Sequence, residues 1–290
     1  MGEKTGYLYR LISDIRVDHP TLSCRAMYYK LQPEAMGRDA FEAFCKELGF
    51  GIERKLNPYR TTNSYGVTRF DNLLVNLSLT DINQAWSSDI TYYEIYGLYY
   101  YITFVMDCYS RKILGHQVSK RLTTEATTLP ALQQAIKTRD GTIPEGMVFH
   151  SDGGGQYYDK SFLKYTAEHL IQNSMCEYAY ENGKAERLNG IIKNNYLIHH
   201  NIKTYEDLCK SVDHAVSLYN TDRPHKSLKY MTPDEYEKNT IILQQQTKPT
   251  MTESLNAKHN MKGAFSPIHV EQTKPQIPDV LPQIYVDQEG

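Results

Sequence analysis

The stretch HSDGGGQY, residues 150–157, restricts the possible folds more than any other part of the chain. A short apolar run, Gly146 to Phe149, precedes it and predicts a buried strand that ends where the glycines begin. Asp152 therefore stands just past a strand end, and the three glycines after it let backbone or a ligand approach closely. Aspartate also favours turns for local hydrogen-bonding reasons, so this residue alone identifies no site.

Two further acidic residues occur in comparable settings. Asp89 lies in a predicted strand, where a carboxylate is out of character. Glu186 lies in a segment that opens a predicted helix, with Asn182 as its N-cap. Glu181 then precedes the helix, whereas Glu186 stands about one turn inside it. We therefore expect the catalytic residues Asp89, Asp152 and Glu186 to converge on divalent metal ions.

Three carboxylates in one site repel one another, so their convergence needs a chemical reason. Two unit charges about 4 Å apart cost about 4 kcal/mol at an effective dielectric near 20. Mg²⁺ prefers oxygen ligands, and two ions about 4 Å apart can activate an attacking oxygen and stabilise a leaving oxygen. The triad therefore predicts two Mg²⁺ or Mn²⁺ ions. Taken singly, the acids would be a satisfied polar group, a turn residue and a solvated helix charge.

Composition narrows the class of protein without deciding its function. The 290 residues can hold one sizeable core and a smaller domain, and 40% hydrophobic with 23% charged residues is ordinary for a soluble protein. No apolar run reaches the length of a membrane span, and the N-terminus lacks a signal-peptide pattern. Five scattered cysteines without a CxxC pair indicate neither zinc nor disulfides, which favours the cytoplasm. A net charge of −2 is unusual for a nucleic-acid binder, although local basic patches can bind phosphates.

Residues 1–50 predict three short helices. The first stops before Pro20, the second follows Ser23 or the nearby Thr21 as N-cap, and the third ends at Gly49. Three compact helices fit a helix-turn-helix DNA-binding domain, whose last helix would enter a major groove. The same pattern fits any small helical domain.

Residues 51–83 predict a polar, basic linker that can follow a DNA backbone. The candidate DNA contacts of the helical domain and this linker are Arg38, Lys46, Arg54, Lys55 and Arg60.

Residues 84–239 predict an α/β core. Three strand-like runs, 90–96, 98–107 and 112–118, form an antiparallel meander with Gly97 at the first turn. A helix, the strand before Asp152, a second helix and a short strand over 171–175 follow. This order is typical of a ribonuclease-H-like fold, a mixed five-stranded sheet with flanking helices. A helix over 205–219 comes later, and the composition of residues 240–290 predicts a disordered tail.

Four segments in this order carry a family resemblance. Asp89, the HSDGGGQY stretch, the helix ENGKAERLNGIIKNNYL and the segment YNTDRPHKSL resemble the integrase-like DDE transposases of bacterial insertion sequences, within the retroviral-integrase superfamily. The group it resembles most is the insertion-sequence-three family, specifically its second-reading-frame product, over roughly residues 7–236. The 33 residues between Asp152 and Glu186 are slightly fewer than is usual, and the shortening falls in the loop before the Glu186 helix.

The resemblance implies a metal-dependent polynucleotidyl transferase, a DNA transposase that cleaves element ends and joins the freed 3′-hydroxyl to target DNA. The implied partners are the double-stranded DNA of element ends and target, further copies of the chain in a synaptic complex, and a first-reading-frame partner protein. The implied setting is the bacterial cytoplasm, with no membrane association.

Several side chains near the three acids are candidate DNA contacts. Gln156 and Tyr157 would border the scissile phosphate, and the Glu186 helix offers exposed polar groups, although such charges often serve only solvation. The candidates on that helix are Lys184, Arg187, Asn189 and Lys193. We expect Asp107 to hydrogen-bond the following turn, 109–111, and His150 to be structural.

Three other functions fit parts of the sequence. A plain ribonuclease-H-like nuclease would use the same acids without strand transfer. A catalytically decayed DNA-binding protein would show no metal-dependent nicking. Arg223 and His225 with one of the 24 tyrosines suggest a tyrosine recombinase, but that mechanism leaves the acids unexplained.

Overall fold

A computed structural model describes residues 3–52, 70–176 and 182–247 of the chain. The chain divides into two compact units, Met1–Leu243 and Gln244–Gly290. The elements described below belong to the first unit, apart from the last residues of the final helix.

The N-terminal residues form the three helices that the sequence predicts: α1 (Glu3–Asp18), α2 (Cys24–Leu31) and α3 (Arg38–Glu47). Ser23 is the N-cap of α2, because its hydroxyl accepts a hydrogen bond from the Ala26 amide at 3.2 Å. One fully buried side chain from each helix (Ile12, Met27 and Phe41) contributes to a shared apolar core. The prediction of three helices is therefore confirmed, whereas their role in DNA binding stays a prediction.

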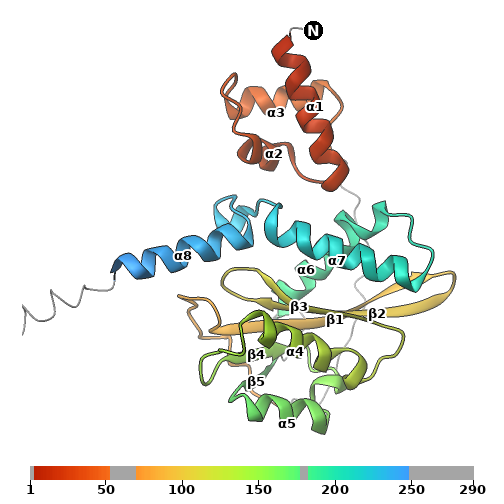
Figure 1. The fold of residues 1–290 in the computed structure, drawn as a ribbon, viewed down its shortest axis with the longest axis vertical. Coiled ribbons are helices and arrows are strands. Elements are labelled where there is room, and N and C mark those ends of the chain that lie inside the picture. The colour runs from red at the N-terminus through yellow and green to blue at the C-terminus, as the bar shows by residue number, and fades with distance from the viewer. Residues whose placement is uncertain (1–2, 53–69, 177–181, 248–290) are drawn as a thin grey trace, which may run out of the picture. The chain divides into compact units, whose positions relative to one another are not determined.

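The central element is a five-stranded mixed sheet (Figure 1). Its strands are β1 (Ala85–Ile95), β2 (Leu98–Asp107), β3 (Ile113–Ser119), β4 (Val148–Ser151) and β5 (Gln172–Met175), in the order β3-β2-β1-β4-β5. The first three strands pair antiparallel, and β4 pairs parallel with both β1 and β5. This arrangement confirms the ribonuclease-H-like class. The turn between β1 and β2 contains Gly97 at φ +81°, as the sequence predicts.

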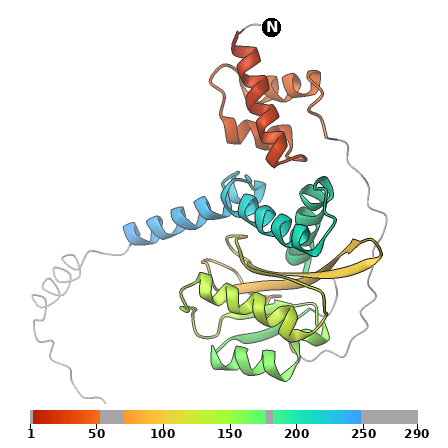
Figure 2. The same ribbon diagram turned by 45° about the vertical axis from the view of Figure 1, so that its right-hand side comes forward.

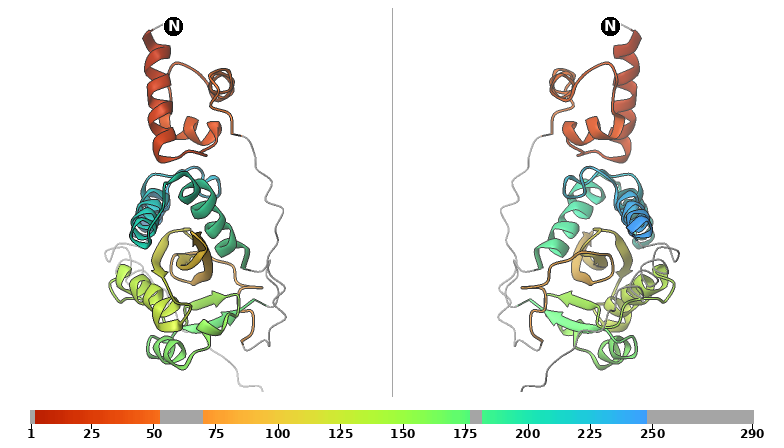
Figure 3. Two further views of the ribbon diagram at one scale, coloured as in Figure 1. Left: turned by 90° about the vertical axis from the view of Figure 1, so that its right-hand side faces the viewer. Right: turned by 90° about the vertical axis from the view of Figure 1, so that its left-hand side faces the viewer.

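Helices cover both faces of the sheet (Figures 1 and 3). On one face, α4 (Thr128–Thr138) and α5 (Lys160–Glu168) pack over Trp86 and Phe149. On the other face, α6 (Gly183–Asn195) and α7 (Tyr205–Thr221) pack over Ile102 and Phe104. Short 3₁₀ turns occur at Thr124–Ala126, Gly155–Tyr157, Leu197–His199 and Lys226–Leu228. The sheet is thereby packed between two apolar layers, and this packing holds the side chains at its edges in place.

Two boundaries differ from the sequence-based prediction. Strand β1 begins at Ala85, before the strand-like run 90–96, because Ala85–Ser87 pairs parallel with β4 and buries Trp86 completely, and it includes Asp89, as the sequence predicts. The final helix, α8 (Pro233–Thr247), extends past residue 240, where the sequence composition predicts a disordered tail. The remainder of that tail, residues 248–290, lies outside the described part of the chain.

The unequal lengths of β1 and β4 leave part of one strand edge without a strand partner. Strand β4 pairs with β1 only over Ala85–Ser87, whereas β1 continues to Ile95. In the part of the chain that the structure describes, no strand therefore pairs with this edge of β1 from Ser88 onward. Asp89 lies at the beginning of this open edge, close to the end of β4.

None of the helices in the described ranges has the length and apolar character of a membrane-spanning segment.

Candidate active site

Asp89 projects from β1 towards the helix that carries Glu186. The Asn189 side-chain amide, on α6, donates a hydrogen bond to Asp89 Oδ2 at 2.8 Å, and the Ile90 backbone amide donates to Oδ1 at 2.9 Å. The carboxylate is half-buried, so these two donors hold a charge that is largely removed from bulk water. The strand and the helix together fix its orientation.

Asp152 follows β4 on the glycine loop. Its Oδ1 accepts a hydrogen bond from the Gly154 amide at 3.1 Å, which closes the tight turn expected after a strand end. Gly153 has φ +82°, and a Cβ there would lie 2.2 Å from the Met175 methyl carbon and 2.8 Å from the Tyr158 hydroxyl. The backbone conformation therefore favours glycine at this position, and a larger residue would also displace the ends of these two side chains.

Glu186 lies in the first turn of α6, with its side chain exposed. Leu188 and Ile192 of the same helix are buried in the core. Asn182 occupies the N-cap position as predicted, but its side chain makes no capping hydrogen bond. Its amide instead donates to the Ser88 carbonyl at 3.0 Å, which ties the start of α6 to β1 beside Asp89.

Asp152 and Glu186 both act electrostatically on Asp89. The pKa of Asp89 is raised to about 7, mainly by burial, then by the negative charge of Asp152 and to a smaller extent by that of Glu186. The hydrogen bonds from Ile90 and Asn189 act in the opposite direction. Burial also raises the pKa of Asp152. A site that disfavours its own carboxylate charges in this way is suited to a cation, which would restore the ionised forms.

The donor set fits a hard divalent cation in its chemistry. All three candidate ligands are carboxylates, the type of oxygen donor that Mg²⁺ takes in proteins. Within residues 3–52, 70–176 and 182–247, however, no three His, Cys, Asp or Glu side chains lie close enough together to enclose one ion. Asp89, Asp152 and Glu186 therefore do not form a closed cage in this part of the chain.

Tyr157 is placed differently from the prediction. It was expected to border DNA, but its ring is only 2% exposed and packs on Phe149 and Phe162. Its hydroxyl forms a hydrogen bond of 2.8 Å with the Ser88 hydroxyl, next to Asp89. Tyr157 is therefore a core residue that connects the loop of Asp152 to β1, because its ring fills the space between them.

Gln156 is half-buried beside the same loop. Its carbonyl accepts hydrogen bonds from the hydroxyls of Thr124 and Thr128, both at 3.1 Å. The expectation that it contacts DNA stays a prediction.

The four polar residues predicted as DNA contacts on α6 fall into different settings. Arg187 is exposed, whereas Asn189 is 6% exposed and is engaged by Asp89. The Lys184 ammonium donates to the Cys108 carbonyl at 3.4 Å, and burial lowers the pKa of Lys184. The Lys193 ammonium lies 4.9 Å from the centre of the Tyr92 ring. Asn189 thus orients a carboxylate, and Arg187 is the most accessible cation of the set.

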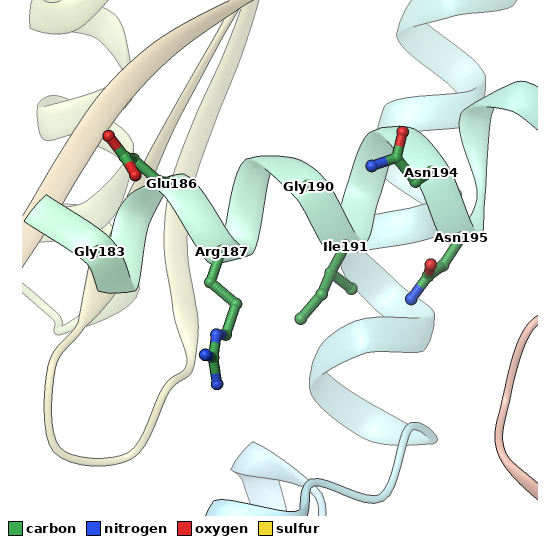
Figure 4. A pocket seen from close by; sticks show the side chains of 7 residues that line it. All are labelled: Gly183, Glu186, Arg187, Gly190, Ile191, Asn194 and Asn195. Carbon is green, nitrogen blue, oxygen red and sulfur yellow. The ribbon is translucent and has the colours of Figure 1, made fainter. Parts of the chain in front are cut away.

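An open groove of about 490 Å³ runs along the outer side of α6 (Figure 4). Its lining residues are Gly183, Glu186, Arg187, Gly190, Ile191, Asn194 and Asn195. Figure 4 shows Arg187, Ile191 and Asn195 extending from the same side of the helix. Sequence reasoning missed Asn194 and Asn195, although their spacing of seven and eight residues from Arg187 is the signal of a shared helix face.

The N-terminal candidates are only partly described. Arg38 is exposed and its guanidinium pairs with the adjacent Asp39 carboxylate at 2.8 Å, while Lys46 is exposed near the end of α3. The linker candidates Arg54, Lys55 and Arg60 lie outside the described residues.

Asp107 and His150 have the structural roles that the sequence predicts. The Asp107 carboxylate accepts hydrogen bonds from the Tyr109 and Ser110 amides at 2.8 and 2.9 Å, which confirms the predicted turn. His150 is completely buried, with Nδ1 2.9 Å from the Ser174 hydroxyl, in keeping with a structural histidine.

His225 provides no support for a tyrosine-recombinase site. The ring is buried, and desolvation lowers the pKa of His225 to about 3, so it stays neutral near neutral pH. A cationic histidine that could stabilise a phosphoryl group is therefore absent at this position.

Comparison with known protein families finds matches over the part of the chain that carries the three acids. Two family models, both described as "Integrase core domain", match residues 80–180 and 171–233. Together these ranges include Asp89, Asp152 and Glu186 and every strand of the sheet.

Individual relatives show the same relationship at modest identity. The insertion element IS600 uncharacterized 31 kDa protein of Shigella sonnei is 27% identical over 235 residues, which is 77% of this chain and 85% of that protein. The putative transposase for insertion sequence element IS986/IS6110 of Mycobacterium tuberculosis is 36% identical over 116 residues, or 38% of this chain. The aligned part is only 41% of the mycobacterial protein.

Among solved structures, the HTLV-2 integrase catalytic core domain in complex with magnesium (trimeric form) is 22% identical to this chain, with a TM-score of 0.45. The match covers 54% of this chain and 97% of that one. The two family matches together span residues 80–233, and the chain therefore carries an integrase core domain over this range.

Proposed function

We propose that this protein is a DNA transposase, a metal-dependent polynucleotidyl transferase that cleaves element ends and joins the 3′-hydroxyl to target DNA. The observation that carries the proposal is the electrostatic coupling of three carboxylates from separate elements, centred on the half-buried Asp89. A fold does not gain stability from such a cluster, because burial and mutual repulsion both oppose its ionisation. A cation-dependent reaction accounts for it.

Asp89, Asp152 and Glu186 are the residues that would hold the metal, as Mg²⁺ or Mn²⁺, with two ions expected. When bound, the metal supplies Lewis-acid stabilisation of the attacking and leaving oxygens of a phosphodiester. Neighbouring residues of the chain position the carboxylates. Asn189 holds the Asp89 carboxylate through its amide, and Gly154 holds Asp152 through its backbone N–H.

Tyr157 and Asn182 both anchor Ser88, one residue before Asp89. The Tyr157 hydroxyl bonds the Ser88 side chain, and the Asn182 amide bonds its carbonyl. Loop, strand and helix are thereby joined at one residue. This rigidity matters, because misplacing a catalytic group by about 1 Å can lower a rate roughly a hundredfold.

The groove along α6 is proposed to receive the DNA backbone. It begins at Glu186 and continues past the exposed Arg187 to Asn194 and Asn195, so a phosphate strand in it would lead directly to an acid of the site. Gly190 has open space above it, where a Cβ would meet only the Asn194 amide, at 3.9 Å. Arginine and amide side chains are common phosphate partners.

The partners that follow from this proposal are double-stranded DNA from element ends and target, further copies of the chain in a synaptic complex, and a first-reading-frame protein. The reaction would take place in the bacterial cytoplasm. Lys184, Lys193 and Gln156 stay proposed DNA contacts, together with the N-terminal Arg38 and Lys46 and the linker residues Arg54, Lys55 and Arg60.

The proposal is tested by incubating the full chain with candidate element ends, Mg²⁺ and a target plasmid. We expect nicked ends and joined products from the wild type, and a loss of at least about a hundredfold in Asp89→Asn and Asp152→Asn, since each removes a charged ligand. Both variants should still fold and bind DNA. Substantial nicking by either one would contradict the metal triad, and nicking without joined products would indicate a ribonuclease-H-like nuclease.

A second assay tests the choice of the third acid. Glu186→Gln should eliminate strand cleavage, because Glu186 is held on α6 and its charge contributes to the raised pKa of Asp89. Glu181, which lies outside the described residues, should tolerate the same substitution and retain most activity. The reverse pattern would show that the loop before α6 shifts the register of the site.

A further inference from the structure

The hairpin of β1 and β2 carries an unusual concentration of tyrosine beside the candidate active site. Tyr92 is 48% exposed and Tyr99 is 53% exposed, although large apolar rings are usually removed from solvent. In Figure 2 the turn of this hairpin reaches past the helices that cover the sheet. Both exposed tyrosines therefore lie within regular strands.

These two rings share one face of the hairpin. Tyr92 pairs across the strands with Tyr101, and Glu94 pairs with Tyr99, so strand alternation places all four on the same side. The Tyr92 and Tyr99 rings meet edge to face, with centroids 5.6 Å apart. The pair forms a fixed aromatic surface, and each partner limits the rotation of the other.

A cation from a different element completes this surface. The Lys193 ammonium, on α6, lies 4.9 Å from the centre of the Tyr92 ring. Because β4 pairs with β1 only over Ala85–Ser87, the lysine can reach the ring past the open edge of β1. The Glu94 carboxylate on the same face interacts with the Tyr99 hydroxyl and raises the pKa of Tyr99.

Lys193 connects this surface to the acids, because it lies on α6 with Glu186 and reaches the Tyr92 ring past the open edge of β1. Tyr92 is three residues from Asp89 along β1, about 10 Å at the rise of a strand, and this odd spacing turns the two side chains to opposite faces of the sheet. Lys193 is seven residues from Glu186 along α6, again about 10 Å at the rise of a helix. Both distances equal about three stacked nucleotides at roughly 3.4 Å each.

We propose that Tyr92, Tyr99 and Lys193 form a stacking platform for unpaired nucleobases of the DNA strand whose phosphate lies at the acidic site. Exposed aromatic rings next to a cation are the combination that binds single-stranded DNA, since bases stack on the rings and phosphates meet the charge. The platform holds the end of the duplex open by about three nucleotides. This inference rests on the proposed DNA-processing function and specifies which form of DNA the site takes.

The test compares two fluorescent duplexes of one sequence, one fully paired and one with three mismatched pairs at its end. Binding to the full-length chain is measured without divalent metal, so that no cleavage occurs. The wild type should prefer the open-ended duplex. Tyr92→Ala and Tyr99→Ala should each reduce that preference about tenfold, within the range of a single base–aromatic stack. Tyr92→Phe and Tyr99→Phe should retain it, because the ring is kept.

Two controls separate stacking from other effects. Tyr96→Ala removes the 80% exposed tyrosine at the turn of the same hairpin, outside the Tyr92–Tyr99 pair, and should leave the preference unchanged. Lys193→Gln should reduce the slope of log K against log salt by about 0.9, the amount expected when one phosphate contact is lost. The tyrosine variants should leave this slope unchanged. An unchanged preference in both alanine variants, or an equal loss in Tyr96→Ala, overturns the platform.

The outcomes also separate this inference from the proposed function. Tyrosine-dependent preference for open ends without Mg²⁺-dependent nicking supports the platform and contradicts the transposase activity. Nicking by a wild type that binds both duplexes equally contradicts the platform and leaves the activity in place.

Discussion

At the scale of single residues, Asp89 lies in a site whose electrostatics oppose its ionisation. Burial is the main cause of its raised pKa, and the neighbouring acids add to it. A single hydrogen bond from Asn189 and one from Ile90 oppose these effects without overcoming them. The ionised form of Asp89 is therefore unfavourable in the metal-free folded protein. Its ionisation can be measured as a change in folding stability.

The sign of that change follows from proton linkage. The pKa of Asp89 in the folded protein is about 7, whereas an aspartate in the unfolded chain has a pKa near 4. The folded state therefore retains a proton that the unfolded state has lost, so the free energy of unfolding falls as pH rises from about 4 to 7 and stays low above it. The loss is at most about 4 kcal/mol.

Asp89→Asn should remove this dependence, because the amide cannot ionise. Urea unfolding with EDTA should show the variant gaining stability over the wild type between pH 5 and pH 8, with little difference near pH 4. Asp159→Asn is a suitable control, since that carboxylate is exposed and caps α5. Identical pH profiles for Asp89→Asn and the wild type would show that Asp89 is not held in a charge-opposing environment.

At the scale of helices and strands, a glycine sets how closely α4 packs on the sheet. A Cβ on Gly115, in β3, would lie 2.1 Å from the Ala131 carbonyl oxygen and 2.8 Å from the Ala135 amide nitrogen. Both atoms are backbone atoms of α4, so a side-chain rotation cannot relieve the clash. The helix would have to move away from the strand.

Gly115→Ala should therefore destabilise the protein by about 1–3 kcal/mol, the usual range for overpacking a core. Chemical denaturation gives the difference directly. Gly155→Ala is the matched control, because a Cβ there meets no atom within 4 Å, and its stability should stay near that of the wild type. A neutral Gly115→Ala would mean that α4 packs less tightly than the structure shows.

Elements were more predictable from the sequence than the contacts that complete the site. Local signals such as the Ser23 cap and the Gly97 turn depend on a few adjacent residues, and the structure confirms them. The Asp89–Asn189 hydrogen bond joins residues 100 apart, and only the packing of α6 on β1 brings them together. Tyr157 was misplaced for the same reason, because nothing local distinguishes a buried tyrosine from one that faces DNA.

At the scale of the whole molecule, the buried residues of the core and of the N-terminal helices form separate apolar clusters, and Tyr230 packs against the N-terminal one. The net charge of −2 excludes a generally basic protein surface as the source of DNA affinity. Affinity must then come from local sites, of which the N-terminal helices with their linker are the proposed source of phosphate contacts.

Removal of residues 1–80 should therefore weaken binding to duplex DNA and flatten the dependence of binding on salt concentration. Each phosphate contact that is lost reduces the slope of log K against log salt by about 0.9. Removal of residues beyond 247, where α8 ends, should leave both the slope and DNA cleavage intact. Fluorescence anisotropy over a salt series measures the slopes, and circular dichroism checks that the shortened chains are folded. An unchanged slope in the chain without residues 1–80 would assign the phosphate contacts to the core instead, with the groove along α6 as the first surface to mutate.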